Sequence, residues 1–185
     1  MTMPEQTAAP ELQALLKDAA LAGTWTLDGT RSAVGLRSKS VWGLVPVKGA
    51  FGQVSGTGTV SADGEVTGRV AVAAASIDTK NKKRDTHLRS AEFFDSENHP
   101  DLVFTVTGIT PSGSGSGATV SGQLTVRDQT RPLSFGAAVT AASAGEVTLD
   151  AKVPVNRSDF GLTWNQLGMS SMDNILDIHA VFSRN

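Results

Sequence analysis

Hydrophobic residues change their spacing at Thr24, and this change divides the chain into a helical part and an extended part. Before Thr24, apolar residues recur about every three to four positions, which is the spacing of one helix face. Pro10 suits the first turn of such a helix, and Gly23 suits its end. The sequence therefore predicts a short helix after a tail of residues 1–9, packed on the domain itself or on a second subunit. Its apolar face consists of Leu12, Leu15, Leu16, Ala19 and Ala20.

From Thr24 onward, apolar and polar residues alternate, which is the period of a half-buried strand. Trp25 and Leu27 begin this pattern, and glycine-containing turn signals separate its later segments. Those segments are 66–72, 102–106, 120–127, 133–139, 147–153 and 175–182. Roughly eight to ten short strands at this spacing predict an antiparallel sandwich or a closed barrel.

One segment, Lys83–Val106, departs from the alternation because it concentrates charged, histidine and aromatic residues. A helical insertion is expected near 84–98, and Pro100 ends it because proline disfavours helix in the residue before it. A charged rim followed by aromatic bulk fits a pocket for an amphiphilic molecule. The same composition fits a loop that plugs one end of a barrel, and the two interpretations stay open.

A run of small side chains affects what the barrel can hold. The strand predicted at 68–79 carries alanine at positions 71, 73, 74 and 75. An eight-stranded barrel is either filled by its own side chains or holds one small ligand. Alanine favours the ligand, although a neighbouring tryptophan or phenylalanine would also fill the space.

The composition of the chain argues against several classes of function. A chain of 185 residues fits one domain with a sizeable core, and its net charge of −2 argues against nucleic acid as the main partner. The absence of cysteine excludes disulfides and thiol chemistry, and the three histidines lack metal-site spacing. No apolar run reaches the ~20 residues of a membrane span, and the first residues lack a signal-peptide pattern. We expect a cytoplasmic protein without metal or cofactor.

Several segments together resemble the YceI-like family of polyisoprenoid-binding, lipocalin-like proteins. The resemblance covers about residues 24–182, in the order expected for the family, and leaves the N-terminal helix outside. The segments are W-T-L-D at 25–28, S-I-D-T at 76–79, R-D-T-H-L-R-S-A-E-F-F-D at 84–95, H-P-D-L-V-F at 99–104, G-Q-L-T-V-R-D-Q-T-R-P-L at 122–133, V-N-R-S-D-F-G-L at 155–162 and D-N-I-L-D-I-H-A-V-F at 173–182.

This resemblance implies a mainly β fold: a single lipocalin-like antiparallel eight-stranded β-barrel with a short helical insertion and an N-terminal helix. Residues 1–22 would form the tail and helix, and residues 23–185 the barrel domain. It further implies an elongated apolar cavity for a polyprenyl lipid or an isoprenoid quinone, and such proteins often form homodimers.

Bulky apolar residues near the predicted strands, together with polar residues of the 84–95 segment, are the candidates for ligand contact. Arg84 would meet an anionic head group, but a structural role for Arg84 and its neighbour Asp85 competes with this, because partly buried charges need partners. The candidate ligand-binding residues are Trp42, Phe51, Arg84, His87, Phe93, Phe94, Phe104, Phe135, Phe160 and Trp164.

Two alternatives to a lipid carrier stay open. In the first, the protein is a lipid-modifying enzyme in which His87 acts as acid or base near Asp85. In the second, the barrel is a structural or stress-related domain filled by its own side chains. Cavity geometry distinguishes the three, because chemistry needs a histidine inside the cavity and the structural domain needs no cavity.

Overall fold

The computed structural model describes residues 12–17, 19–112, 117–143, 145–165 and 170–185. Helix α1 spans Leu12–Lys17, so the predicted start at Pro10 lies outside the described residues. Within the described part, eleven strands form one sheet. They are β1 Gly23–Leu27, β2 Ala33–Ser40, β3 Val45–Phe51, β4 Val54–Val60, β5 Val66–Ala73, β6 Ile77–Asp78, β7 Asp101–Pro111, β8 Gly117–Val126, β9 Gln129–Ala142, β10 Glu146–Asn156 and β11 Asp173–Arg184.

Three pairs of consecutive strands are each one long strand interrupted by a bend. These pairs are β1 with β2, β3 with β4, and β5 with β6. The C-terminal half of β11 pairs with β1, and its N-terminal half pairs with β2. In the same way, β4 pairs with β1 and β5, whereas β3 continues beside β2 and β6. The interruptions lie at residues 28–32, at 52–53 and at the short helix η1, Ala74–Ser76. The described sheet is therefore an eight-stranded meander with three bent members.

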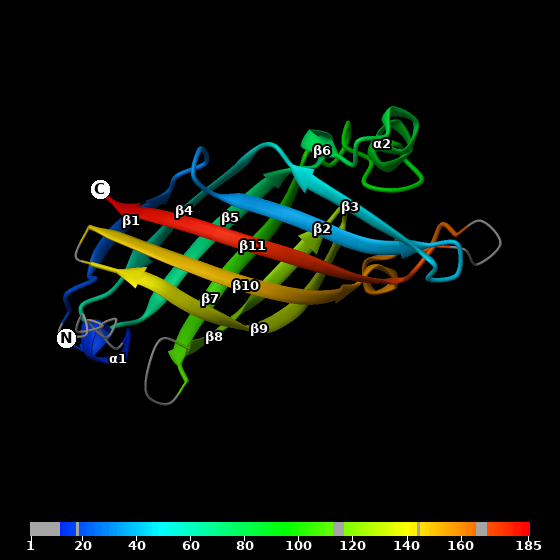
Figure 1. Cartoon of the computed structure of the whole chain (residues 1–185). Coiled ribbons are helices and arrows are strands. Elements are labelled where there is room, and N and C mark those ends of the chain that lie inside the picture. Colours follow the sequence, from blue (N-terminus) through cyan, green and yellow to red (C-terminus); the bar gives the residue numbers. More distant parts are fainter. Residues whose placement is uncertain (1–11, 18, 113–116, 144, 166–169) are drawn as a thin grey trace, which may run out of the picture.

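The sheet closes on itself because β11 returns to pair with β1, and every pairing is antiparallel. Alternation is clear on β8, where Ala118, Val120 and Leu124 are buried between more exposed residues. The short helix α2, Lys82–Arg89, interrupts the meander between β6 and β7. The prediction of a mainly β, eight-stranded antiparallel barrel with an N-terminal helix and a short helical insertion is confirmed (Figure 1).

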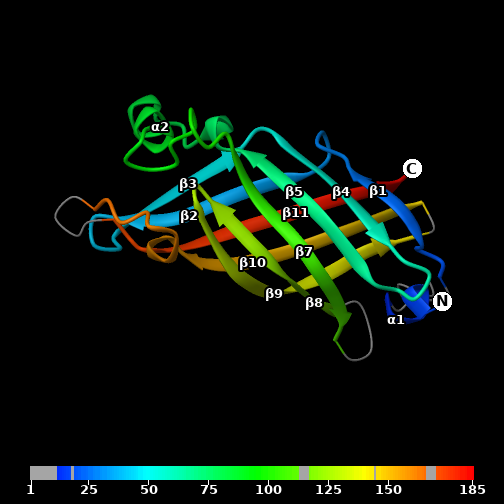
Figure 2. The ribbon, with the colours of Figure 1, turned by 180° about the vertical axis from the view of Figure 1, so that it is seen from behind.

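Helical elements lie at the two ends of the barrel, as both ribbon views show (Figures 1 and 2). Helix α1 lies at the end where β1 begins and β11 finishes, which we call the α1 end. The opposite end, the α2 end, carries α2, the β2–β3 turn and the short helix η2, Arg157–Phe160. No helix in the described part is long and apolar enough to cross a bilayer.

Two hydrophobic clusters match these two ends. Leucines of α1 pack with Trp25, Ala118 and Val139 at the α1 end. The other cluster, toward the α2 end, combines Phe51, Phe94 and residues from β8 and η2. The core is thus concentrated at the ends of the barrel.

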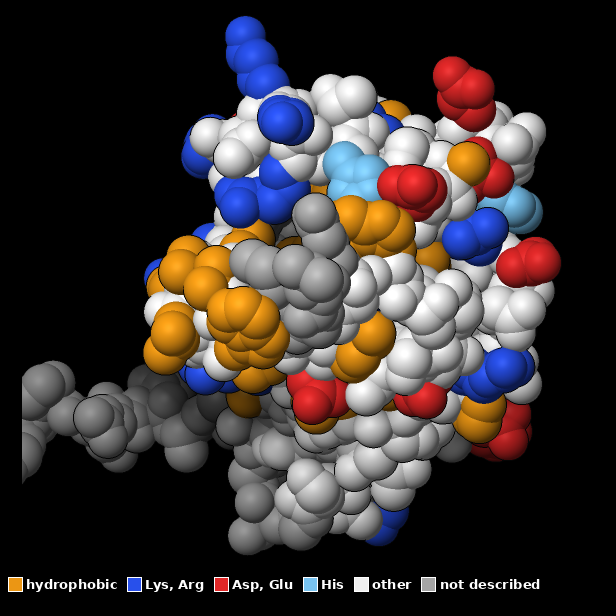
Figure 3. Space-filling model, turned by 90° about the vertical axis from the view of Figure 1, so that its right-hand side faces the viewer, with side chains coloured by type: hydrophobic (Ala, Val, Ile, Leu, Met, Phe, Trp, Pro, Cys, Tyr) orange, Lys and Arg blue, Asp and Glu red, His pale blue; other side chains and the backbone are white. Residues whose placement is uncertain are grey.

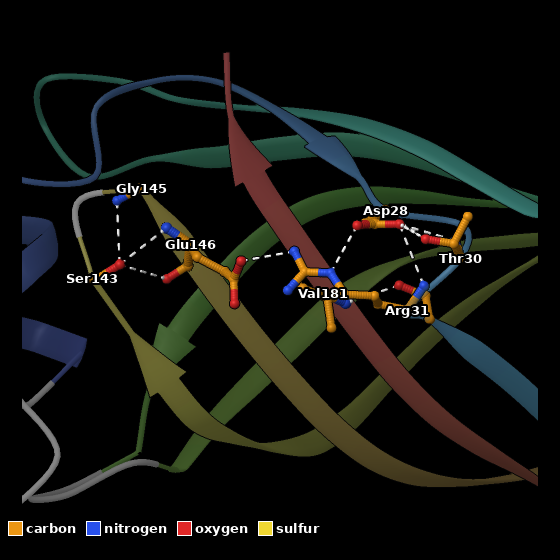
Figure 4. A network of polar contacts seen from close by, with 8 residues as sticks. Asp28, Thr30, Arg31, Ser143, Gly145, Glu146 and Val181 are labelled. Carbon is orange, nitrogen blue, oxygen red and sulfur yellow. Dashed lines mark hydrogen bonds and ion pairs between the residues drawn. The ribbon is translucent and has the colours of Figure 1, made fainter.

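A polar network fixes the bend between β1 and β2 (Figure 4). The Asp28 carboxylate accepts hydrogen bonds from Thr30 Oγ1 at 2.6 Å and from Arg31 Nε at 2.8 Å. Arg31 also donates to Glu146 at 2.7 Å, in the turn between β9 and β10. The Thr30 hydroxyl and the Arg31 guanidinium hold the pKa of Asp28 well below its usual value, and Glu146 and Asp28 raise the pKa of Arg31. The network ties the bend to a neighbouring turn.

Candidate functional site

The barrel encloses an apolar cavity of about 230 Å³ between the two clusters. One water molecule needs only ~10–15 Å³ of such space, so the cavity is far larger than a packing defect. Valines, leucines and phenylalanines from β3, β4, β5, β7, β8, β9, β10 and β11 provide most of the lining. Arg69 and His179 belong to the same wall but are exposed, so their polar ends lie on the outside. The interior is therefore not filled by its own side chains.

Glycines on β4 and β5 explain much of this space. The inward positions of β4 are Val54 and Val60 at its two ends, with Gly56 and Gly58 between them. Gly58 pairs with Gly68 on β5, so neither strand places a side chain at this level of the wall. A Cβ on Gly68 would lie 2.8 Å from the Thr57 carbonyl oxygen, which is too close. The backbone itself forms the cavity wall here.

Phe104 on β7 and Phe135 on β9 line the part of the wall that follows β5, with ring centroids 5.5 Å apart. A Cβ on Gly122 of β8 would lie 2.7 Å from Cζ of Phe104, so this ring lies directly over the glycine. The aromatic pair can contact an apolar chain in the cavity, since ring faces and edges both pack against hydrocarbon.

At the α1 end, Leu12, Leu16 and Leu21 reach the cavity together with Trp25. The Trp25 indole Nε1–H donates to the Leu21 carbonyl at 2.8 Å, which satisfies its polar atom in an otherwise apolar place. All four residues are at least nine-tenths buried. Helix α1 therefore covers this end with side chains that contact the same space as the barrel strands.

At the α2 end, a row of rings runs from the cavity wall to the surface. Phe51 lines the cavity and lies 6.0 Å from Phe94, which is 5.4 Å from Phe93. Phe93 in turn lies 6.1 Å from the His87 ring, and that ring lies 4.2 Å from Trp164. All these distances join ring centroids. The structure thus brings together five of the residues that the sequence proposed for ligand contact, although only the first of them touches the cavity.

Polar contacts attach α2 to the barrel. Arg84 donates to Thr79 through Nε at 2.7 Å and through its terminal nitrogen to the Thr79 carbonyl at 3.0 Å. Buried Asp85 accepts from the Thr79 backbone N–H and hydroxyl at 2.9 and 2.6 Å. Arg89 donates to the Ala75 and Ile77 carbonyls. These contacts favour the structural interpretation of Arg84 and Asp85.

His87 and Asp85 belong to separate pairs. His87 Nε2 lies 2.7 Å from Glu92 Oε2, whereas Asp85 is bound to Thr79. Neither residue belongs to the cavity lining. Among the described residues, no three histidine or carboxylate side chains gather in a way that could hold a metal ion.

The side chain of Arg157 packs against the row of rings at Phe93. Its guanidinium is buried and lies 5.3 Å from the Phe93 ring centroid. It donates to the carbonyls of Leu162 at 2.6 Å, Trp164 at 2.8 Å and Ser171 at 3.0 Å. Burial lowers the pKa of Arg157. One charged side chain therefore links the segment after η2 to Ser171, which lies shortly before β11.

The candidate residues divide by position. Phe51, Phe104 and Phe135 line the cavity. Phe94 and Phe160 are buried in the α2-end cluster, while Trp42 and Trp164 are exposed at that end. A role in ligand contact for residues away from the lining, including Arg84, His87 and Phe93, stays a prediction. The sequence analysis did not name Leu12, Leu16, Leu21 or Trp25 as lining residues. The spacing of Leu12, Leu16 and Trp25 marked these three as apolar positions of a helix face or a strand, and Leu21 was not singled out.

Known proteins share this arrangement. The crystal structure of BcnA from Burkholderia cenocepacia superposes with a TM-score of 0.75 at 23% identity, over 84% of this chain and 98% of that one. A polyisoprenoid binding domain from Saccharophagus degradans, described as implicated in plant cell wall breakdown, gives 0.71 at 17% identity, over 87% and 98%. These similarities establish the shared fold.

Sequence comparison is consistent with the structural one. A UPF0312 protein of Staphylococcus aureus (strain MRSA252) is 28% identical over 150 residues, which cover 77% of this chain and 84% of that protein. Residues 25–182 match the YceI-like domain, a region that runs from Trp25 in β1 to Phe182, near the end of β11. Because this match includes all the barrel strands, the chain belongs to the YceI-like family.

Proposed function

We propose that this protein binds and carries an apolar isoprenoid lipid, either a polyprenyl lipid or an isoprenoid quinone, in the barrel cavity, without catalysing a reaction on it. The observation that carries the proposal is the cavity itself, with its lining of aliphatic and aromatic side chains. A pocket of this kind selects for shape and apolar surface, because it offers few groups that would pair with a polar ligand.

Burial alone supplies enough free energy for this mode of binding. Each buried CH₂ group contributes about 0.8 kcal/mol, so one five-carbon isoprene unit contributes roughly 3–4 kcal/mol before the entropy of ordering the chain is subtracted. Affinity would rise with each unit that enters the cavity. Beyond the length of the cavity, further units would add little.

The family and one structural neighbour support the isoprenoid class. The Saccharophagus degradans neighbour is described as a polyisoprenoid binding domain, and it covers 87% of this chain. The Phe104–Phe135 pair and the glycine-rich β4–β5 wall provide a narrow apolar space in which a branched, unsaturated chain packs well.

Native mass spectrometry of the full chain, purified without detergent and then extracted with organic solvent, tests the proposal. We expect one isoprenoid per barrel in the extract. A protein that emerges empty, and that also fails to take up added polyprenyl phosphate and ubiquinone, would contradict it.

Two neighbouring alanines on β9 offer a matched pair of variants. Ala137 lines the cavity, whereas Ala138 is exposed on the outer face of the same strand. We expect Ala137→Phe to weaken isoprenoid binding by about tenfold or more, because the new ring occupies cavity volume and displaces buried ligand surface. Ala138→Phe should bind like the unmodified protein. Equal binding by both variants would place the ligand elsewhere.

A further inference from the structure

Large exposed hydrophobic residues gather at one end of the molecule. Within the described part of the chain they are Trp42, Leu44, Val45, Trp164 and Ile175, with exposed fractions from 36 to 78%. Each lies in or directly beside the turn between β2 and β3, after η2, or at the start of β11, all toward the α2 end. Figure 3 looks onto this end and shows hydrophobic side chains clustered on one side of it. Clustered apolar exposure marks an interaction surface, whereas scattered exposure does not.

The most exposed of these residues lie in the turn of residues 41–45, which we call the β2–β3 tip. Trp42 is 66% and Leu44 is 78% exposed. Val41 and Trp42 both adopt left-handed backbone conformations, with φ of 52°, and the Leu44 N–H donates to the Val41 carbonyl. A left-handed conformation is costly for a branched residue such as valine. The backbone of the tip is therefore strained, and its two largest apolar side chains are nevertheless exposed to solvent.

Basic residues flank the tip. Lys39 and Lys48 lie on the strands that lead into and out of it, and both are exposed. Lys82 and Lys83 are exposed in the first turn of α2 at the same end. None of these four lysines makes an ion pair with any residue that the structure describes. On the adjacent strand β11, Asp177 is already ion-paired with Arg37.

We propose that the β2–β3 tip docks on an anionic lipid bilayer, with Trp42 and Leu44 inserted at the level of the head groups and Lys39 and Lys48 facing lipid phosphates. Tryptophan favours the membrane interface because its ring is apolar and its N–H is polar. Lysines keep their charged ends in the polar layer while their stems cover apolar surface. This inference goes beyond the proposed function and does not depend on what fills the cavity.

Charge favours a bilayer over a second copy of the chain. Two copies meeting symmetrically at the tip would bring identical lysines together, because a two-fold interface pairs the same patch with itself. Like charges across an interface oppose association. An anionic bilayer instead attracts each lysine near its surface. The apolar and basic parts of this end thus fit the same partner.

Flotation of the full chain with lipid vesicles tests the proposal. Vesicles of phosphatidylcholine mixed with phosphatidylglycerol should carry the protein to the top of the gradient, and vesicles of phosphatidylcholine alone should carry much less. Trp42→Ser combined with Leu44→Ser should lower partitioning about tenfold or more, because the inserted apolar surface is removed. Lys39→Glu combined with Lys48→Glu should remove the preference for anionic vesicles.

A conservative variant locates the contact. Acyl chains brominated near the head group should quench the tryptophan fluorescence of the unmodified protein. Trp42→Phe should still bind vesicles but lose most of this quenching. Circular dichroism checks that each variant keeps the strand spectrum.

Three outcomes would overturn the proposal. The first is a protein that ignores anionic vesicles, and the second is vesicle binding that the Trp42→Ser/Leu44→Ser variant retains. The third is a dimer in solution that this variant converts to a monomer while vesicle binding is absent, since the tip would then join two copies. Isoprenoid uptake, measured separately by mass spectrometry, would be unaffected by any of the three.

Discussion

At the scale of single residues, Arg157 shows how this barrel accommodates a buried charge without a carboxylate. Carbonyl oxygens from the segment after η2 surround its guanidinium, and the Phe93 ring covers one face. Arginine suits this site because its planar group presents several donors in fixed directions. A lysine would offer one point of charge and could not reach the same set of carbonyls.

Replacing Arg157 by methionine should lower the free energy of unfolding by about 3 kcal/mol, because several buried carbonyls lose their donor at once. Urea denaturation followed by circular dichroism measures the loss. Arg131→Met is the matched control, since Arg131 is exposed and its side chain bonds to Thr130 and Gln129 at the start of its own strand; its effect should stay within about 0.5 kcal/mol. Equal effects from the two variants would mean that the carbonyl cage does not stabilise the fold.

Residue-level features also show what the sequence could and could not predict. Alternation placed Phe104 and Phe135 in predicted strands as candidates for ligand contact, and both line the cavity. It could not separate the cavity from the packed ends, because Val126, buried in the α2-end cluster, follows the same pattern on β8 as Leu124, which lines the cavity. The exposure of Trp42 depends on left-handed backbone angles in its turn, for which the local sequence carries only Gly43 as a signal.

At the scale of elements, α1 is notable because it lies before the region that matches the family, yet contributes to the cavity. It rests on the β4–β5 turn: a Cβ on Gly64 would lie 3.0 Å from the Leu16 carbonyl oxygen. Gly64 has φ of 85°, so this position needs glycine both for its backbone and for the close approach. The turn and the helix are thus fitted to each other.

Substituting Leu16 by aspartate should loosen α1 and admit solvent to the cavity, because a buried charge without a partner favours the open state. In a Trp42→Phe/Trp164→Phe background, Trp25 is the remaining fluorophore and acrylamide should quench it more strongly. Ala14→Asp on the exposed face of the same helix is the control. Unchanged quenching in the Leu16 variant would show that α1 does not control access to Trp25.

The positions of the strands were the part of this fold that the sequence predicted best. Strands expected at 133–139, 147–153 and 175–182 lie within β9, β10 and β11, and the one expected at 120–127 coincides with β8 up to Val126. The bends at 28–32 and 52–53 were less visible, because polar and glycine residues occur there as they do in ordinary turns. Only the pairing of β11 with both β1 and β2 shows that they belong to one interrupted strand.

At the scale of the whole molecule, polar contacts between strands on the outer face depend on carboxylates. Hydrogen bonds hold the pKa values of several carboxyl groups below their usual range, among them those from Thr30 to Asp28, from His179 to Asp150 and from Arg37 to Asp177. A lowered folded-state pKa contributes stability above the unfolded value, near pH 4, and this contribution is lost as the pH falls through the folded value. These contacts therefore stabilise the folded barrel at neutral pH.

We expect the melting temperature to stay nearly constant from neutral pH to about pH 5 and to decline below about pH 4. Thermal denaturation across this range measures the decline. A variant with asparagine at 28, 150 and 177 should start from a lower melting temperature and lose less on acidification. The same acid slope in both proteins would assign the effect to other carboxylates.

The three strand interruptions have a mechanical consequence. They occur in neighbouring strands, at 28–32, 52–53 and 74–76, so together they form a line across the barrel wall. Ladder pairing stops at this line, and isolated bonds such as Gly52 N–H to the Ser76 carbonyl replace it. A sheet bends most easily where its ladder is discontinuous, so the wall has a preferred crease. A force on the β2–β3 hairpin would bend the wall first along this line, and the continuous strands from β7 to β11 would keep their shape.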